Sequence, residues 1–146
     1  MLICRVRTIC AALALNNVVE TMRPLPVEPF AGAPSFVRGL AVIRGAPTPV
    51  VDLGLLLGCR EPAEPTRFVT LAVGERRVAV AVEGVEGMRE FASDAAQELP
   101  PLLKDASAGA VAAVRALDAE LMVVLSAARV IPEQVWRELA KKGGSP

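Results

Sequence analysis

Residues 34–58 constrain the fold most strongly, because two apolar arms flank a tight turn in this stretch. Gly45 lies between the arms and can take the positive φ that a two-residue hairpin turn requires at its first central position. Pro47 and Pro49 have no N–H and would face the same side of the second arm. Since that side cannot donate to a neighbouring strand, we expect this hairpin at a sheet edge or a strand end.

The second arm ends in a helix-capping pattern. Asp52 precedes the leucine-rich residues 53–57 and is a candidate N-cap, and Gly58 is a candidate helix stop. Arg44 stands at the turn beside the expected unpaired edge, where a partner could dock. Alternatively, its guanidinium folds back onto the Asp52 carboxylate or onto carbonyl groups of the turn.

Other stretches carry the same strand–turn–strand pattern. Residues 68–82 alternate on either side of Gly74, which opens a two-residue turn, and residues 112–125 predict a last hairpin. Residues 2–8 alternate with the period of a half-buried strand. Short strands at this close spacing predict an all-β barrel or sandwich.

The segment 59–66 is the best candidate for an internal joint, because it holds two prolines, three charges and little that could be buried. Two hairpin-rich halves that meet there suggest two small sub-barrels. Pro132 stands where a first helical position favours proline, and an apolar stripe through Trp136 predicts a C-terminal helix that Gly143 closes. Trp136 either packs this helix onto the barrels or anchors a partner.

The composition argues against several classes of function. The 146 residues include 16 basic and 16 acidic side chains, no histidine and 3% aromatic residues. A neutral chain with few aromatics lacks the basic surface and the stacking platforms that nucleic-acid binding usually needs. Without histidine, C-x-x-C spacing or a glycine-rich phosphate loop, we predict no catalytic centre, no cofactor and no metal site.

The cysteines and the apolar runs bear on the compartment. Three cysteines leave an odd thiol, which suits the reducing cytosol. No window approaches the roughly 18 apolar residues of a membrane span. Arg5 and Arg7 precede the apolar residues 9–15, as in a signal peptide, but a suitable small-residue cleavage site does not follow. We therefore expect a cytoplasmic protein.

The first hairpin also carries a resemblance to a known family. The run F-V-R-G-L-A-V-I-R-G at 36–45, followed by P-V-V-D-L at 49–53, is similar to the signature of the CheW-like chemotaxis coupling domain. In that family an aromatic-V/I-K/R-G strand leads to an N-L-R-G turn, and P-V/I-I/V-D-L follows. The similarity extends over roughly residues 3–131. Val42 replaces the asparagine of N-L-R-G, and Pro47 is an additional proline.

The resemblance implies a fold and a division of the chain. The coupling-domain fold consists of two five-stranded β-barrels packed around a shared hydrophobic seam, and its first and last strands can exchange between the barrels. We therefore expect residues 1–131 to form a CheW-like domain of two sub-barrels with their joint near 59–66. Residues 132–146 would form a short C-terminal helix and tail.

The resemblance also implies a function. Coupling domains of this family are non-enzymatic adaptors that bridge the cytoplasmic tip of a chemoreceptor and the CheW-like regulatory domain of a CheA-type histidine kinase. Such a protein is cytoplasmic and receptor-associated at the inner face of the membrane, without direct insertion into it. Carried over residue by residue, partner binding would involve Val18, Glu20, Gly39, Arg44 and Gly45.

Two alternatives stay open at this point. The chain could be a CheW-like scaffold of another receptor-linked pathway, such as motility or development, with an altered kinase contact. It could also be a small-barrel ligand-binding module or an enzyme that the sequence does not reveal. Val42 bears on this choice, because it removes a polar side chain beside Arg44.

Overall fold

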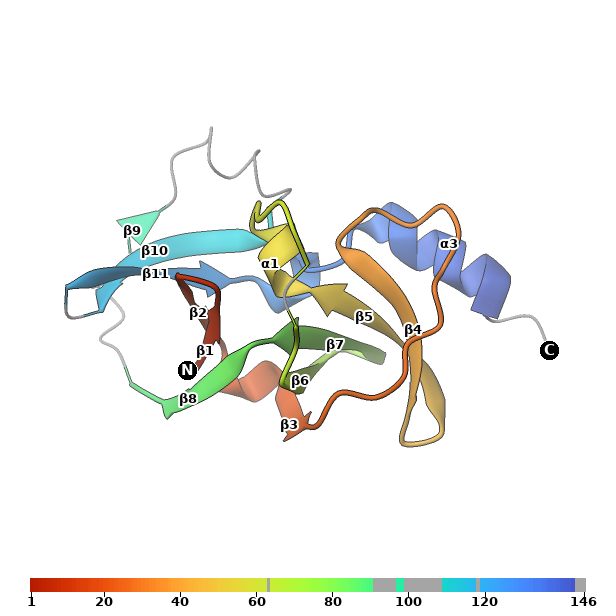
Figure 1. The fold of residues 1–146 in the computed structure, drawn as a ribbon, viewed down its shortest axis with the longest axis horizontal. Coiled ribbons are helices and arrows are strands. Elements are labelled where there is room, and N and C mark those ends of the chain that lie inside the picture. The colour runs from red at the N-terminus through yellow and green to blue at the C-terminus, as the bar shows by residue number, and fades with distance from the viewer. Residues whose placement is uncertain (63, 91–96, 99–108, 118, 144–146) are drawn as a thin grey trace.

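Two packed β-sheets make up most of the protein (Figure 1). The computed structural model describes residues 1–62, 64–90, 97–98, 109–117 and 119–143. The six-stranded sheet has the spatial order β8 (Gly84–Met88), β1 (Leu2–Val6), β2 (Ile9–Leu13), β11 (Glu120–Leu125), β10 (Val111–Leu117) and β9 (Gln97–Glu98). The five-stranded sheet has the order β3 (Val18–Met22), β6 (Arg67–Val73), β7 (Arg76–Val82), β5 (Ala46–Asp52) and β4 (Val37–Ile43).

Among the described residues, the helical elements are few and short: η1 (Leu15–Asn17), α1 (Leu53–Leu56), η3 (Ala127–Arg129) and α3 (Glu133–Gly143). The predicted all-β fold of two packed units with a C-terminal helix is confirmed. Backbone pairing among the described residues closes neither sheet into a full barrel, because β8 and β9 bound one sheet while β3 and β4 bound the other.

The two ends of the domain share the six-stranded sheet. The β1–β2 hairpin pairs with β11 in parallel, with Cys10 opposite Met122, so the first strands join the last ones. The segment 59–66 links α1 to β6, which is a strand of the five-stranded sheet. The chain crosses between the sheets near η1 and at Glu83.

A continuous apolar seam lies between the sheets, as the resemblance implied. Both sheets, α1 and α3 contribute buried side chains to it, among them Leu2, Leu13, Leu53, Val69, Leu71, Val78, Val80, Leu125, Val135 and Leu139. Full burial of one such aliphatic side chain contributes roughly 1.5–3 kcal/mol. The seam is therefore the main source of stability that holds the two sheets together.

The C-terminal helix α3 is attached at the seam and at β7. Trp136 is half-buried against the seam, and the guanidinium of Arg76 lies 5.0 Å from the centre of its ring. Arg76 also donates to both carboxylate oxygens of Glu133 at 2.8 Å. In the part of the chain that the structure describes, no helix is long and apolar enough to cross a membrane.

Candidate partner-binding site

The β4–β5 turn is a two-residue turn made by Arg44 and Gly45. The ladder closes at the pair Ile43 and Ala46, and both central residues have positive φ, 52° at Arg44 and 79° at Gly45. This is the pattern of a type I′ hairpin. The prediction that Gly45 occupies the first central position is therefore wrong, because Arg44 does. A left-handed backbone costs a non-glycine residue about 1–2 kcal/mol, which other contacts of Arg44 must offset.

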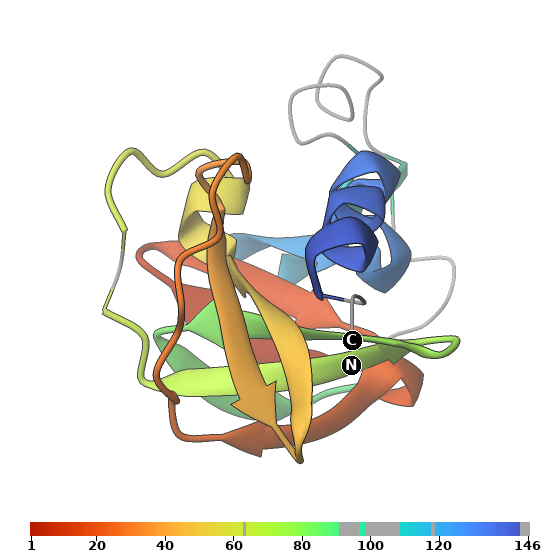
Figure 2. The same cartoon turned by 90° about the vertical axis from the view of Figure 1, so that its right-hand side faces the viewer.

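The two prolines explain how the hairpin leaves the sheet. Pro47 and Pro49 lie opposite Val42 and Leu40 of β4, and β5 pairs with β7 only from Val50 onward. Residues 46–49 thus form the half of β5 that has no β7 partner, where a missing N–H costs nothing. The predicted strand end is confirmed, and the tip of the hairpin projects beyond the ladder (Figure 2).

An ion pair connects this projecting tip to the opposite margin of the sheet. Arg44 donates through Nε to Glu20 Oε2 at 3.0 Å and through Nη2 to Glu20 Oε1 at 2.6 Å. Glu20 lies on β3, whereas Arg44 follows β4, and these are the two outer strands of the five-stranded sheet. The side chains therefore join two margins that the backbone leaves unpaired. We call this pair the Glu20–Arg44 clasp.

The clasp is exposed on one side and partly covered on the other. The Arg44 side chain is 77% exposed and that of Glu20 25% exposed. Hydrogen bonds from Arg44 lower the pKa of the Glu20 carboxyl below its ordinary value, and the same bonds raise the pKa of Arg44. A carboxyl with a lowered pKa stabilises the folded state above its ordinary pKa, and this contribution disappears as the pH falls through the lowered value.

We therefore expect the clasp to stabilise the fold at neutral pH and to lose this effect below about pH 4. The melting temperature of Glu20→Gln should lie below that of the wild type at pH 7, and the difference should shrink between pH 5 and about pH 3. Glu75→Gln, at the exposed β6–β7 turn, is the control and should show no such convergence. A gap that stays constant with pH would contradict the assignment.

The clasp borders a hollow of about 200 Å³ at one end of the five-stranded sheet. All five strands line this hollow, which we call the sheet mouth: Val19 and Glu20 from β3, Thr70 from β6, Arg77 from β7, Ala46 and Thr48 from β5, and Ile43 from β4, with Arg44 of the turn. Behind it the sheet curls around a small core of Ala41, Ile43, Val50, Phe68, Ala79 and Ala81. The arrangement is a partly closed barrel with a polar opening.

Of the five residues carried over from the resemblance, Glu20 and Arg44 line the mouth; Gly45 lies in the turn beside it, and Val18 and Gly39 lie elsewhere. Val18 is half-buried and packs against the seam, whereas its neighbour Val19 is 48% exposed and lines the mouth. Gly39 is at a bulge in β4 with φ 143°, and a Cβ on it would lie 1.9 Å from the carbonyl oxygen of Glu28. Glu28 pairs there with Leu40 through two backbone hydrogen bonds of 2.8 and 2.9 Å. Gly39 thus lets residues near Glu28 lie directly on β4.

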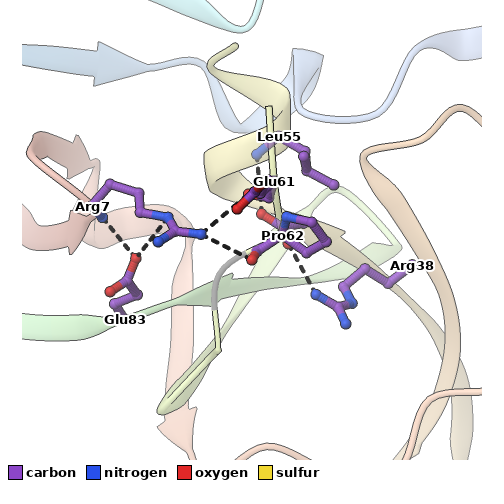
Figure 3. Close-up of polar contacts among 7 residues, drawn as sticks. Arg7, Arg38, Leu55, Glu61, Pro62 and Glu83 are labelled. Atoms are coloured by element: carbon purple, nitrogen blue, oxygen red, sulfur yellow. Dashed lines mark hydrogen bonds and ion pairs between the residues drawn. The ribbon is translucent and has the colours of Figure 1, made fainter. Parts of the chain in front are cut away.

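The alternative partner proposed for Arg44 is wrong, because Asp52 pairs with Arg38. Arg38 Nη1 donates to Asp52 Oδ2 at 3.0 Å, and the Leu55 N–H donates to Asp52 Oδ1 at 3.0 Å (Figure 3). The predicted N-cap of α1 is confirmed, and Gly58 follows the helix with φ 100°. The Asp52 side chain is only 3% exposed, so its charge depends on Arg38.

A second polar cluster braces the crossing between the sheets (Figure 3). The Arg7 N–H, in the β1–β2 turn, donates to Glu83 Oε1 at 2.8 Å. Its guanidinium donates to the carbonyl oxygens of Glu61 and Pro62 at 3.5 and 3.0 Å. Arg7 therefore ties the N-terminal hairpin both to the crossing residue Glu83 and to the segment 59–66.

Sequence reasoning missed Val19, Thr48, Thr70 and Arg77 as members of the mouth. A usable signal existed for Arg77, because alternation along β7 places it on the same face as Ala79 and Ala81. Extended to the start of β7, the same alternation predicts that the Arg77 guanidinium lies at the rim of the mouth. Thr70 gave no such signal, since its hydroxyl bonds to the carbonyl of Glu20, which only the fold brings near, and the hydroxyl of Thr48 bonds locally to the carbonyl of Ala46.

The chain is similar to known proteins of one family. A family model described as the CheW-like domain matches residues 1–135. The chain is 29% identical over 112 residues to the chemotaxis protein CheW of Rhizobium meliloti (strain 1021), covering 75% of this chain and 72% of that protein. Its fold is similar to that of the crystal structure of the scaffolding protein TtCheW from Thermoanaerobacter tengcongensis. The TM-score is 0.74 at 15% identity, and 86% of each chain is covered.

Proposed function

Because the chain belongs to the CheW-like domain family, we propose that it is a non-enzymatic adaptor of chemotaxis that couples chemoreceptors to a CheA-type histidine kinase. The observation that carries this proposal is the family match over residues 1–135, which includes both sheets. The relative from Rhizobium meliloti is a chemotaxis protein, in agreement with this role. The absence of histidine from the sequence supports a function without phosphotransfer by this chain.

The adaptor would act by holding two partners at once. Simultaneous docking raises the effective concentration of the kinase at the receptor, and a change in receptor geometry then changes kinase activity. The protein would work in the cytoplasm, at the cytoplasmic tips of receptors in the inner membrane. Its partners would be proteins, and it would neither bind nucleic acid nor insert into the membrane.

The receptor-docking surface would be the Arg44–Gly45 turn with Glu20 and Val19. Arg44, Gly45 and Val19 are exposed at the sheet mouth or its rim, and Glu20 is partly buried beside them. Gly39 and Val18 would contribute indirectly, Gly39 by allowing the close approach of Glu28 to β4 and Val18 by packing β3 onto the seam. The kinase would dock on another surface of the chain.

We expect Arg44→Ala to weaken binding of the receptor cytoplasmic fragment by about tenfold or more, because a charge-assisted hydrogen bond would be lost. Binding of the kinase regulatory domain should change far less. Isothermal titration calorimetry with each partner measures both affinities. Arg67→Ala, an exposed arginine at the far end of the same sheet, is the control.

Stability has to be followed in the same variants. If Arg44→Ala lowers both affinities in proportion to its melting temperature, the clasp is a structural brace only. If a stable Arg44→Ala protein binds the receptor as well as the wild type does, the docking assignment is wrong. Neither result tests the adaptor function itself, which is tested separately by a pull-down with the kinase.

One observation favours a second candidate function, that of a scaffold in another receptor-linked pathway. Val42 is 69% exposed beside the turn, where the family pattern has an asparagine. An isopropyl group there cannot make the hydrogen bonds of an amide, so a partner that relied on them would bind poorly. The small-molecule alternative gains less support, because the sheet mouth, at about 200 Å³, is smaller than the roughly 300–1,000 Å³ of usual ligand pockets.

A further inference from the structure

A second guanidinium stands at the sheet mouth. Alternation along β7 sends Arg77 to the same face as Ala79 and Ala81, which belong to the small core inside the five-stranded sheet. Because Arg77 is at the start of the strand, its side chain reaches the opening and lines the mouth rather than the core. Its neighbour Arg76 faces the opposite way and is bound to Glu133 of α3.

The charges at the mouth do not cancel. Its lining contains two guanidinium groups, Arg44 and Arg77, and one carboxylate, Glu20. Both oxygens of Glu20 already accept hydrogen bonds from Arg44. Within the described residues, the guanidinium of Arg77 has neither a hydrogen-bonded nor an ion-paired partner, while its backbone pairs with Ala72 in the sheet. The opening therefore carries one uncompensated positive charge, set inside a rim of strands.

The remaining polar groups of the mouth do not supply this charge with a partner. The hydroxyl of Thr48 donates to the carbonyl oxygen of Ala46 at 3.1 Å, and that of Thr70 donates to the carbonyl oxygen of Glu20 at 3.3 Å. Both hydroxyl protons are therefore hydrogen-bonded within the sheet. The N–H donors that remain available at the opening belong to the guanidinium groups. Such a site repels cations and binds a planar anion through parallel N–H groups.

We propose that the sheet mouth captures one carboxylate side chain, an aspartate or glutamate, of the protein that docks on the Arg44 turn, with Arg77 as its main contact. This inference rests on the proposed function only in that the carboxylate belongs to a protein partner. The hollow of about 200 Å³ suits a single side chain rather than a larger ligand. Arg77 thereby selects for an acidic residue, while the Glu20–Arg44 clasp shapes the rim around it.

The site can be tested with a small probe and the full chain. We would record ¹H–¹⁵N spectra while adding N-acetyl-glutamate N-methylamide, and repeat the titration with the glutamine analogue, which has the same shape and no charge. The glutamate probe should shift the amide signals of Ala46, Thr48, Thr70 and Arg77 in a saturable way. The glutamine probe should leave these signals nearly unchanged.

Substitutions of Arg77 then test whether its positive charge binds the probe. Arg77→Gln should weaken the glutamate probe at least about fivefold, and Arg77→Lys should restore part of the affinity. Arg67→Gln, an exposed arginine outside the mouth, should behave like the wild type. Equal shifts with both probes would overturn the proposal, as would an unchanged affinity in Arg77→Gln. The comparison of probes uses wild-type protein, so it holds even if a variant folds poorly.

The result is separable from the adaptor function. If the glutamate probe titrates at the mouth but the receptor fragment does not bind the wild type, the proposed function fails and the carboxylate site stands. If the receptor fragment binds and Arg77→Gln does not alter that binding or the probe titration, the carboxylate site fails alone.

Discussion

Gly39→Ala should lower the free energy of unfolding by about 3 kcal/mol or more, the largest effect that we expect from a single methyl group in this chain. Two costs add. The backbone at Gly39 has φ 143°, which side-chain-bearing residues rarely adopt, and the new Cβ would lie 1.9 Å from the carbonyl oxygen of Glu28. Because that atom belongs to the backbone, it moves only if the Glu28–Leu40 pairing breaks.

Urea-induced unfolding followed by circular dichroism measures this loss, and Gly32→Ala is the matched control. Gly32 has a comparably unfavourable φ of 83°, yet a Cβ there would meet nothing within 4 Å. The control should therefore lose only the conformational part, about 1–2 kcal/mol. Equal losses in the two variants would mean that the segment carrying Glu28 gives way easily. Receptor binding by Gly39→Ala, corrected for the folded fraction, then tells whether Gly39 has any role beyond shape.

Arg38→Ala should cost about 3 kcal/mol, more than is usual for an arginine on a β-strand. The reason is its partner: the Asp52 side chain is 3% exposed and would keep a buried charge without a counter-ion. Removal of the Asp52 charge would instead leave Arg38, whose side chain is 36% exposed and can reach water. Asp52→Asn should therefore be the milder substitution, since asparagine still accepts the Leu55 N–H and caps α1.

A double-mutant cycle checks this asymmetry. In the Asp52→Asn background, Arg38→Ala should lose most of its effect, because no buried charge remains to be stranded. Arg67→Ala serves as the exposed control and should stay within about 0.5 kcal/mol of the wild type. If Arg38→Ala costs the same in both backgrounds, its role is packing by the aliphatic part of the side chain rather than charge compensation.

The parts of the fold that depend on local pattern could be predicted from the sequence. The β4–β5 and β6–β7 hairpins, the Asp52 cap and the C-terminal helix follow from residues close together in the chain. The order of strands in the sheets could not be derived in this way, because a period of two says which face is buried and not which strand is the neighbour. The joint near 59–66 stays a prediction; the strands on either side of it in the chain, β5 and β6, both belong to the five-stranded sheet.

The candidate site shows the same limit. Glu20 and Arg44 were each singled out, but their pairing depends on the curl of the sheet, which brings β3 and β4 together from opposite margins. The sequence alone offers Asp52 or the carbonyl groups of the turn as alternative partners of Arg44, because both are nearer to it in the chain than Glu20. A role of Gly39 in partner binding stays a prediction, and the close approach of Glu28, which the sequence does not reveal, gives a structural reason for glycine there.

The pairing of β2 with β11 has a consequence for how the chain folds during synthesis. Strands β3–β7 are contiguous in sequence, so their sheet can form as soon as Val82 has left the ribosome. The N-terminal hairpin has no such option, since its neighbour β11 is among the last strands to be made. The β2 edge therefore stays unpaired until Glu120–Leu125 has been translated, which exposes it to mispairing. Contacts between the two ends of a chain also slow folding. We therefore expect the six-stranded sheet to assemble after the five-stranded one, because its β2–β11 pairing joins strands that are far apart in the sequence.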